Sequence, residues 1–425
     1  MPPKKFVFFS KKFDNFKQMR YNKFMEQTIV IIGGGASGLM LADALPKTTR
    51  VIIVERGERL GRKLSATGNG QGNVTNINAH KEAYFSVEDT RNSRAESLVR
   101  EQDPTSLQTY FSSLGVLLAA DSRGRVYPTG KQASALTDAL RYSIARKGVE
   151  TRLQARAIDL EKTSDGFFVT VQTESGTERI FADYVAVCAG GKAAKNFGTD
   201  GSAYALVKPL GHTVTTLYPS LVQLKTDTKY TKTLKGIRVA DGVLTAKQKG
   251  QTRAEKGDIL FTEYGISGDA TFRISAFIAD KITDGVELTV DFLPDFSEEQ
   301  LLRIVTEKQK TFPDLPSGEL LFGIVNNQIG RAIMKRADGD VASAVRFLKS
   351  FPLTVTGTLG FDYAQVTKGG IPLSETDGDL QSRFAKNLYF AGEILDVDGQ
   401  CGGFNLQWAY SSAKTVAAAL IKKCK

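Results

Sequence analysis

The sequence predicts an α/β fold in which a Rossmann-like domain is divided between the two ends of the chain. A strand, a glycine-rich turn, a helix and a second strand follow one another over residues 28–55. A further buried strand followed by glycines stands near the C-terminus, at 386–393. From about residue 192 the pattern changes to short β-rich segments and then to helical ones. Because alternating strands and helices build parallel sheets, we expect both ends to share one sheet and the middle to be inserted.

The first elements form a βαβ unit. Thr28 to Ile32 is a run rich in β-branched residues, which is typical of a strand buried on both faces. Residues 36–45 are helical in composition and end at Pro46, and residues 51–54 form a second buried strand. A glycine- and asparagine-rich loop is expected over 61–76.

Later elements follow from the same kinds of pattern. The Ser-Glu-Glu-Gln stretch that begins at Ser297 is a capping box, so a helix is expected to begin there and run to about residue 310. Further strands are expected at 149–160, 166–173, 178–187, 286–292 and 386–390, and further helices at 131–147, in the stretch up to about 351, and at 403–421.

These elements predict three parts in the chain. The parts are a basic, disordered tail at 1–26, a discontinuous Rossmann-like domain at 27–191 and 355–425, and an insert at 192–354, with its β-rich portion at 213–292 and its helical portion at 297–351.

Composition excludes several classes of protein. The chain has 425 residues, of which 41% are hydrophobic and 24% charged, as in an ordinary globular protein. Three cysteines cannot build a disulfide framework, and two histidines argue against a histidine-rich metal site or a Ser-His-Asp triad. The apolar run at 6–9 is too short for a signal peptide, and the greasy stretch 28–45 contains four glycines and Asp43. We therefore expect a cytoplasmic protein with no metal and no membrane partner.

The net charge of +10 is concentrated in two segments. Residues 1–25 contain seven basic residues and one acid, and residues 225–256 contain nine basic residues and three acids. The second segment either follows nucleic-acid phosphates or is a solvated face of lysine-rich strands. We prefer the solvated face, because runs of charge usually have that role.

Residues 33–38 form a G-x-G-x-x-G motif in the context that binds a dinucleotide. Gly33 permits the tight turn, Gly35 lets the backbone approach a pyrophosphate, and Gly38 lets the helix pack on the sheet. The helix N-terminus then faces the phosphates. Glu55 stands 22 residues after Gly33, at the end of the second strand, where a carboxylate accepts hydrogen bonds from ribose hydroxyls.

This motif alone fits FAD or NAD, and the C-terminal segment favours FAD. An NAD-binding domain is one continuous block, whereas here a second buried strand leads into Gly392, then Gly402, Gly403 and a helix. A helix N-terminus stabilises the negative charge of a reduced flavin ring. No second motif of this kind is seen for NADH or NADPH. Either a nicotinamide reduces the flavin without its own domain, or the substrate supplies the electrons.

Over about 27–421, the sequence resembles the bacterial FAD-dependent oxidoreductases of the aminoacetone oxidase, or BaiN-type, family. The stretches that carry the resemblance include IIGGGASGL, VERGERLGRKLSATGNGQGNVTN, FTEYGISG and LYFAGEILDVDGQCGGFNLQWAYSSA. The resemblance implies an FAD-binding domain at both chain ends, with an inserted β-barrel plus helices.

The resemblance also implies which residues contact FAD. They are Gly33, Gly35, Ala36, Ser37 and Gly38 at the pyrophosphate, Glu55, Arg56 and Ala157 at the adenosine end, Lys63, Leu64, Thr67, Gly68 and Asn73 in the next loop, Gly191 at the end of the strand that enters the site, and Gly392, Glu393, Gly403, Phe404 and Asn405 near the ribityl chain and ring. Four positions depart from the family pattern, namely Gln71, Gly72, Glu263 and Asp269. These departures leave the substrate and the acid–base roles open.

Lys368, Glu263 and Cys401 are the candidate catalytic residues for proton transfer, with Tyr264 and Arg125 as further candidates. Each has a plain structural alternative: a solvated carboxylate for Glu263, an ion pair for Lys368 or Arg125, and packing between glycines for Cys401. Outside this set, Cys188 is interpreted as strand packing, and His80 and His212 as loop residues.

Three functions compete. The first is a flavoenzyme that oxidises a small amine or ketoamine, or reduces an activated C=C bond, by hydride exchange. The second is an RNA-modifying flavoenzyme that reduces uridine in ribosomal RNA and binds it through residues 225–256. The third is a flavin-binding redox sensor without turnover. Oligomeric state stays open.

Overall fold

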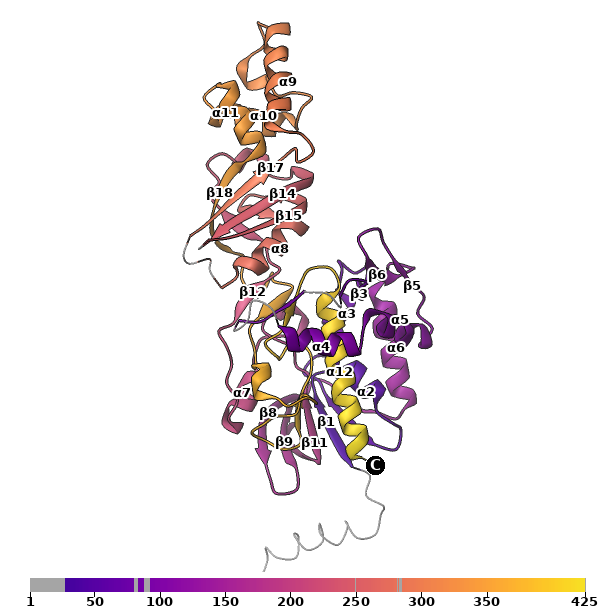
Figure 1. Ribbon diagram of the computed structural model, residues 1–425. Helices are drawn as coiled ribbons and strands as arrows, with labels where there is room; N and C mark the ends of the chain where they lie inside the picture. Colours follow the sequence, from indigo (N-terminus) through magenta and orange to yellow (C-terminus); the bar gives the residue numbers. More distant parts are fainter. Residues whose placement is uncertain are drawn as a thin grey trace, which may run out of the picture.

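The computed structural model describes residues 27–79, 83–87, 92–248, 250–280, 282 and 285–424. The expected basic tail at 1–26 and His80 lie outside the described residues. Figure 1 shows two lobes stacked end to end. One lobe contains both ends of the described chain, and we call it the flavin lobe; the middle of the chain forms the other, the barrel lobe.

A five-stranded parallel sheet forms the centre of the flavin lobe. Its order is β20-β11-β1-β2-β7, and its strands are β1 Thr28–Ile32, β2 Arg50–Val54, β7 Glu150–Arg152, β11 Tyr184–Val187 and β20 Leu388–Phe390. The C-terminal β20 pairs in parallel with β11, with Val185 opposite Leu388. The two chain ends therefore share one sheet, which confirms the predicted α/β fold.

Helices and a meander surround this sheet. The predicted α2 Ala36–Ala44 packs against the long C-terminal α12 Phe404–Lys423, most of whose buried residues are apolar. The other flavin-lobe elements are α4 Ser93–Glu101, α5 Pro104–Ser113, α6 Ala133–Arg146, α7 Tyr204–Val207, the meander β8 Arg156–Lys162, β9 Phe167–Thr173 and β10 Gly176–Ala182, and the small sheet β3 Thr75–Asn76, β6 Arg125–Pro128 and β5 Leu118–Ala120.

Two details differ from the sequence expectations. The strand expected over 149–160 is broken, because Gln154 has a left-handed backbone and its N–H donates to Gly57 O. Its first part joins the parallel sheet as β7, and its second part starts the meander as β8. The loop expected over 61–76 contains a one-turn helix, α3 Arg62–Ser65, and the short strand β3.

The barrel lobe contains a closed six-stranded barrel and a helical end. The barrel order is β13-β16-β15-β14-β17-β18, with β13 Leu224–Thr226, β14 Arg238–Gln248, β15 Gln251–Phe261, β16 Gly265–Ser267, β17 Val286–Asp291 and β18 Phe351–Thr358. Helix α8 Asp269–Ile278 packs on β15. The expected division at 354/355 falls inside β18, because that strand completes the barrel.

The helical end confirms the capping box. Ser297 Oγ accepts from Gln300 N at 3.2 Å, and Gln300 Oε1 accepts from Ser297 N at 2.8 Å, at the start of α9 Glu298–Thr311. Two further helices follow, α10 Asn327–Arg336 and α11 Val341–Lys349. Single 3₁₀ turns lie at Lys195–Phe197, Lys208–Leu210, Lys232–Leu234, Ser317–Glu319 and Leu373–Glu375.

Two short pairs of strands form the junction between the lobes. β12 Tyr218–Ser220 pairs antiparallel with β19 Val366–Lys368, so the segments leading into and out of the barrel lobe run side by side. β21 Asp398–Gly399 pairs with β4 Tyr84–Phe85, and β21 contacts β19. Each lobe has its own hydrophobic core. Within the described residues, no helix combines the length and apolar character needed to cross a bilayer.

Candidate functional site

The carboxyl ends of four parallel strands meet at one edge of the sheet. β1 leads into Gly33, β2 into Glu55, β11 into Gly191 and β20 into Gly392. Cys188 N donates to Ile32 O at 2.7 Å, which holds the first and third of these ends together. In open α/β sheets, ligands bind at this edge, where the chain reverses the direction of strand order. The fold thus gathers four of the residues expected to bind FAD.

The glycine-rich turn after β1 has the shape that a pyrophosphate requires. Gly33 has φ +104°, and a Cβ there would lie 2.6 Å from Cys188 O. A Cβ on Gly38 would overlap Gly33 O, so α2 packs closely on the turn. At Gly35, by contrast, a Cβ would meet no atom within 4 Å. α2 also begins without a side-chain cap, so its first N–H groups face outward.

Glu55 shapes the same turn. Its carboxylate accepts from Gly34 N at 2.8 Å and from Gly57 N at 2.7 Å, one bond to each oxygen. Each oxygen keeps a further lone pair that can accept from a ribose hydroxyl. Ala155 N donates to Glu55 O at 3.0 Å, which brings the segment before Ala157 to this end of the site.

Arg56 turns toward an acid that sequence reasoning missed. Its guanidinium lies 2.6 Å from Asp200. Burial of Asp200 opposes ionisation, but hydrogen bonds from Arg56 and Ser202 prevail and lower the pKa of Asp200 to about 2. Asp200 follows β11 in a glycine-rich loop, and no motif in the sequence connects it to Arg56.

A polar cluster joins the loop after β2 to the turn after β20. Lys63 Nζ lies 2.7 Å from Glu393 Oε2, although the two residues are 330 positions apart. Glu393 Oε1 accepts from Thr367 N at 2.8 Å. Thr367 Oγ1 in turn accepts from the backbone N–H groups of Lys192 and Ala193, at 2.7 and 2.9 Å. The two predicted residues come together, and Thr367 joins them through backbone pairings that the sequence does not reveal.

The start of α12 borders the site together with the glycine turn and the Lys63–Glu393 cluster. Gly403 has φ +104°, and a Cβ there would overlap the backbone of Thr75. α12 has no side-chain cap and no acid in its first turn, so it can stabilise negative charge. Nearby, Asn73 Oδ1 is buried without a hydrogen-bond donor among the described residues. An orphaned acceptor, two uncapped helix starts and the open space at Gly35 all fit FAD.

Other expected contacts have mainly structural roles. Leu64 and Phe404 are buried in the core, and Ser37 Oγ donates to Ala391 O at 3.2 Å, next to Gly392. The Asn405 amide closes the turn before α12 through bonds to Gly399. Thr67 Oγ1 donates to Leu64 O at 2.7 Å and Gly68 has φ +58°, so this loop turns sharply beside Asn73. Ala36 is the first residue of α2.

The three catalytic candidates have different surroundings. Lys368 is 8% exposed on β19, directly after Thr367. Burial raises the pKa of Cys401 to about 11, so its sulfur stays a thiol at neutral pH and is no thiolate nucleophile. The side chain of Glu263 is 68% exposed in a barrel turn that also contains Tyr264, and it pairs with Lys235. Lys368 adjoins the expected flavin site through Thr367, Cys401 lies two residues before Gly403 at the start of α12, and Glu263 lies in the barrel lobe.

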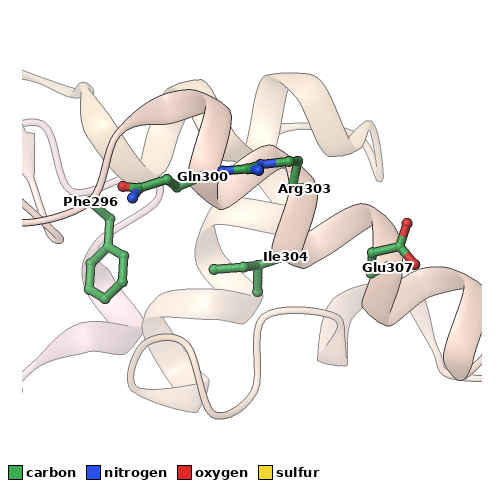
Figure 2. A pocket seen from close by; sticks show the side chains of 5 residues that line it. All are labelled: Phe296, Gln300, Arg303, Ile304 and Glu307. Atoms are coloured by element: carbon green, nitrogen blue, oxygen red, sulfur yellow. The ribbon is translucent and has the colours of Figure 1, made fainter.

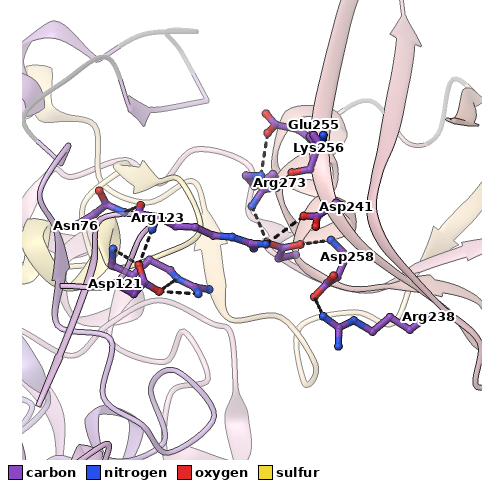
Figure 3. A network of polar contacts seen from close by, with 11 residues as sticks. Asn76, Asp121, Arg123, Arg238, Asp241, Glu255, Lys256, Asp258 and Arg273 are labelled. Carbon is purple, nitrogen blue, oxygen red and sulfur yellow. Dashed lines mark hydrogen bonds and ion pairs between the residues drawn. The ribbon is translucent and has the colours of Figure 1, made fainter. Parts of the chain in front are cut away.

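An ion-pair network connects the two lobes at this junction (Figure 3). Arg123, from the β5–β6 turn of the flavin lobe, reaches Asp269 at 2.9 Å and Asp241 at 3.3 Å, both in the barrel lobe. Asp269 also accepts from Asp258 N at 2.7 Å and pairs with Arg273 at 3.3 Å. Asp269 is one of the departures from the family pattern, and here it links the lobes. Arg125 is not part of this link, because it pairs with Asp121 at 2.7 Å.

The departure at Gly72 also has a physical reason. Gly72 has φ +81°, and a Cβ there would lie 2.9 Å from Cα of Ala133, at the start of α6. Any side chain at this position would require that helix to move. The neighbouring Gln71 is exposed to solvent, and nothing in the structure explains its identity.

Two of the residues interpreted as structural, His212 and Cys188, lie within the described part of the chain. His212 is buried in a loop, with Nδ1 2.8 Å from Glu375 and Nε2 2.7 Å from Ser382. Burial raises the pKa of Cys188 to about 12, consistent with packing. Among the described residues, no group of three or more His, Cys, Asp or Glu side chains is arranged to bind a metal ion.

A surface depression on α9 is remote from this site. Figure 2 shows that it is lined by one helix face and the turn before it, with Phe296 and Ile304 among its residues. It lies at the outer end of the barrel lobe, so it plays no part in cofactor binding.

The sheet edge, the glycine turn and the start of α12 define a dinucleotide-binding oxidoreductase of the FAD type. The chain matches the model of the HI0933-like protein Rossmann domain over residues 27–419 and belongs to that family. This match confirms the resemblance inferred from the motifs. The chain is thus an FAD-dependent oxidoreductase by class.

Curated relatives cover nearly the whole chain. It is 35% identical over 405 residues to a 3-dehydro-bile acid delta(4,6)-reductase of Clostridium scindens, and the aligned part covers 90% of this chain and 96% of that relative. It is 27% identical over 417 residues to a ribosomal RNA dihydrouridine synthase of Escherichia coli, which spans 92% and 97%. A solved 3-ketosteroid dehydrogenase of Rhodococcus jostii covers 94% of this chain and 98% of its own, at 15% identity and a TM-score of 0.48.

Proposed function

We propose that this chain reduces a C=C bond conjugated to a carbonyl group in a small organic molecule. The observation that carries the proposal is the full-length similarity, at 35% identity, to a reductase of that type. It is supported by the edge where four strand ends and two uncapped helix starts converge. Bound FAD would supply the hydride.

The chain's own residues would divide the work of holding FAD. The turn at Gly33 to Gly38 and the start of α2 would hold the pyrophosphate, and Glu55 the adenosine ribose. The Lys63–Glu393 pair would stand beside the linking chain. Asn73 Oδ1 and the start of α12 would meet the ring, the first as an acceptor and the second as a source of positive potential.

We propose NADH or NADPH as the source of electrons. The described chain contains one Rossmann sheet, and its glycine turn is assigned to FAD. A nicotinamide would therefore supply the hydride to the flavin without a Rossmann domain of its own. We also propose a cytoplasmic location, which is supported by the free state of Cys188, Cys401 and Cys424.

The structure gives less support to ribosomal RNA as the substrate. That alternative depended on the nine basic residues of 225–256. Four of them pair with acids: Lys235 with Glu263, Arg238 with Asp258, Arg253 with Glu255, and Lys256 with Asp295. The segment is thus less positive than its sequence suggests, and the similarity to the RNA enzyme is lower.

The test is an anaerobic titration of the purified yellow protein, followed by its visible spectrum. We expect NADH or NADPH to bleach the flavin, and a 3-oxo-4-ene steroid to restore the colour with release of the saturated ketone. Bleaching by an amine, with no response to enones, would replace the proposal with amine oxidation. Restoration by ribosomal RNA alone would replace it with uridine reduction. A protein that never binds FAD would overturn all three.

A further inference from the structure

Asp398 is a buried carboxyl group that the FAD contacts do not use. It lies on β21, and the residue is 1% exposed. Its Oδ1 has no hydrogen-bond partner among the described residues, and its Oδ2 lies 3.5 Å from Ser220 Oγ. A buried carboxylate with so few donors is strongly destabilised relative to the neutral acid.

The backbone brings Asp398 and Lys368 to the same junction. Lys368 lies opposite Tyr218 in the β12–β19 pair, and Ser220 lies on the same short strand as Tyr218. Just after Lys368, a Cβ on Gly370 would lie 2.7 Å from Ile394 O, so the backbone there packs tightly on the segment that leads to Asp398.

Charges around Asp398 come from three sides. Burial raises its pKa to about 7; Lys368 opposes that rise, whereas Asp396 and Asp280 add to it, and the Ser220 hydroxyl favours the ionised form slightly. The carboxyl group therefore exchanges its proton near neutral pH, close to a buried lysine.

We propose that Asp398 is a positioning residue that stores the proton of the reaction and acts through Lys368. This inference rests on the proposed function. Lys368 follows Thr367, whose N–H donates to Glu393 at 2.8 Å, so it adjoins the expected flavin site. Asp398 lies between the Glu393 turn and the start of α12 along the chain. In this proposal the pair adjoins the site of hydride transfer, and Lys368 is the member that meets the substrate.

The step balances as follows. The C=C π bond breaks, and two C–H bonds form, one from the hydride that NADH or NADPH supplies through FAD and one from a proton. An N–H bond of the Lys368 ammonium breaks to give that proton to the carbon beside the carbonyl. The O–H bond of Asp398 then breaks to return a proton to the lysine amine, and water later reprotonates the carboxylate. The active form of Asp398 is protonated, so kcat falls as pH rises through about 7.

The variant Asp398→Asn tests this role, since the amide keeps the shape but stores no proton. We expect unchanged FAD content and KM, kcat lower by about 100-fold, and loss of the fall in kcat above neutral pH. Rescue by Asp398→Glu is expected in part. Asp314→Asn is the matched control, because Asp314 is exposed at the outer end of the barrel lobe. A variant that keeps the wild-type pH profile would overturn the inference.

A second readout needs no substrate. In the infrared difference spectrum of the FAD-loaded protein, the band of a protonated carboxylic acid should be present one pH unit below the pKa of Asp398 and absent one pH unit above it. The band should be absent at both pH values in Asp398→Asn. If the band is present but enones do not react, the proposed function fails, whereas the protonated state of Asp398 near neutral pH is confirmed. If enones react but the band is absent, the reductase stands and the role of Asp398 is refuted.

Discussion

At the scale of single residues, the site depends on carboxylates with opposite environments. Glu55 accepts two backbone N–H bonds, whereas Asp398 is buried with almost no donors. The position of Glu55 was predictable, because a carboxylate after the second strand belongs to a local motif. Asp398 was not predictable, because its burial arises from strands that are distant in sequence.

Replacing Glu55 by alanine should weaken FAD binding. The variant removes the acceptor for Gly34 N and Gly57 N as well as the ribose contact. Hydrogen bonds to charged groups contribute about 1.5–3 kcal/mol each, so we expect the Kd for FAD to rise by at least about 10-fold. Equilibrium dialysis measures it, with the exposed neighbour Glu58→Ala as control. Equal FAD retention in both variants would refute the assignment of Glu55.

Asp398 should also make stability depend on pH. Its pKa is about 7 in the folded protein and near 3.8 when unfolded. The folded state therefore holds the proton more tightly, and the stability it gives is complete below pH 3.8 and lost as pH rises through about 7. Relative to Asp398→Asn, wild type should lose on the order of 4 kcal/mol across this range. Urea unfolding at several pH values measures the difference, and parallel curves would contradict it.

At the scale of elements, long periodic segments were predictable and short paired ones were not. The sequence predicts strand β1, helix α2 and helix α12 from their hydrophobic patterns and from the glycines at their boundaries. β12, β19 and β21 have two or three residues each, and each owes its conformation to a partner far along the chain. Lys368 and Asp398 lie on these short strands, which is why the sequence offered Lys368 only as one of several candidates and did not offer Asp398.

The start of α12 should not tolerate a side chain. Gly403→Ala would place a Cβ against the backbone of Thr75, at φ +104°. Strain of this kind costs about 1–3 kcal/mol, so we expect a lower melting temperature and loss of FAD. Gly378→Ala is the control, because a Cβ there would meet no atom within 4 Å. Thermal unfolding followed by flavin fluorescence distinguishes them, and similar melting curves would show that α12 can shift.

At the scale of the whole molecule, the division into two lobes was foreseen, but their attachment was not. The change of pattern at about residue 192 marked the insert, and the resemblance implied its barrel. The network of Arg123, Asp241 and Asp269 joins a turn, a strand and the start of a helix that no local pattern connects.

Removing this link should loosen the lobes more than it unfolds them. The Arg123 side chain is 47% exposed, and such pairs contribute about 0.2–1 kcal/mol. We expect Arg123→Ala to lower the melting temperature slightly and to raise KM for the substrate, with wild type approaching the variant at high salt. Arg303→Ala, on the exposed face of α9, is the control. A double-mutant cycle with Asp269→Asn measures the coupling, and additive effects would show that the link is not energetic.

The pairing of β12 with β19 has a consequence for how this architecture can change. Since the chain leaves and re-enters the flavin lobe through adjacent strands, the two cut ends would be neighbours if the barrel lobe were removed. The barrel lobe can therefore be replaced by another inserted domain without any change in the strand order of the flavin lobe. Such a replacement would change substrate specificity and leave the domain that binds the cofactor as it is. Lys368, however, lies on β19, where the chain re-enters the flavin lobe, so it would be retained in any such replacement.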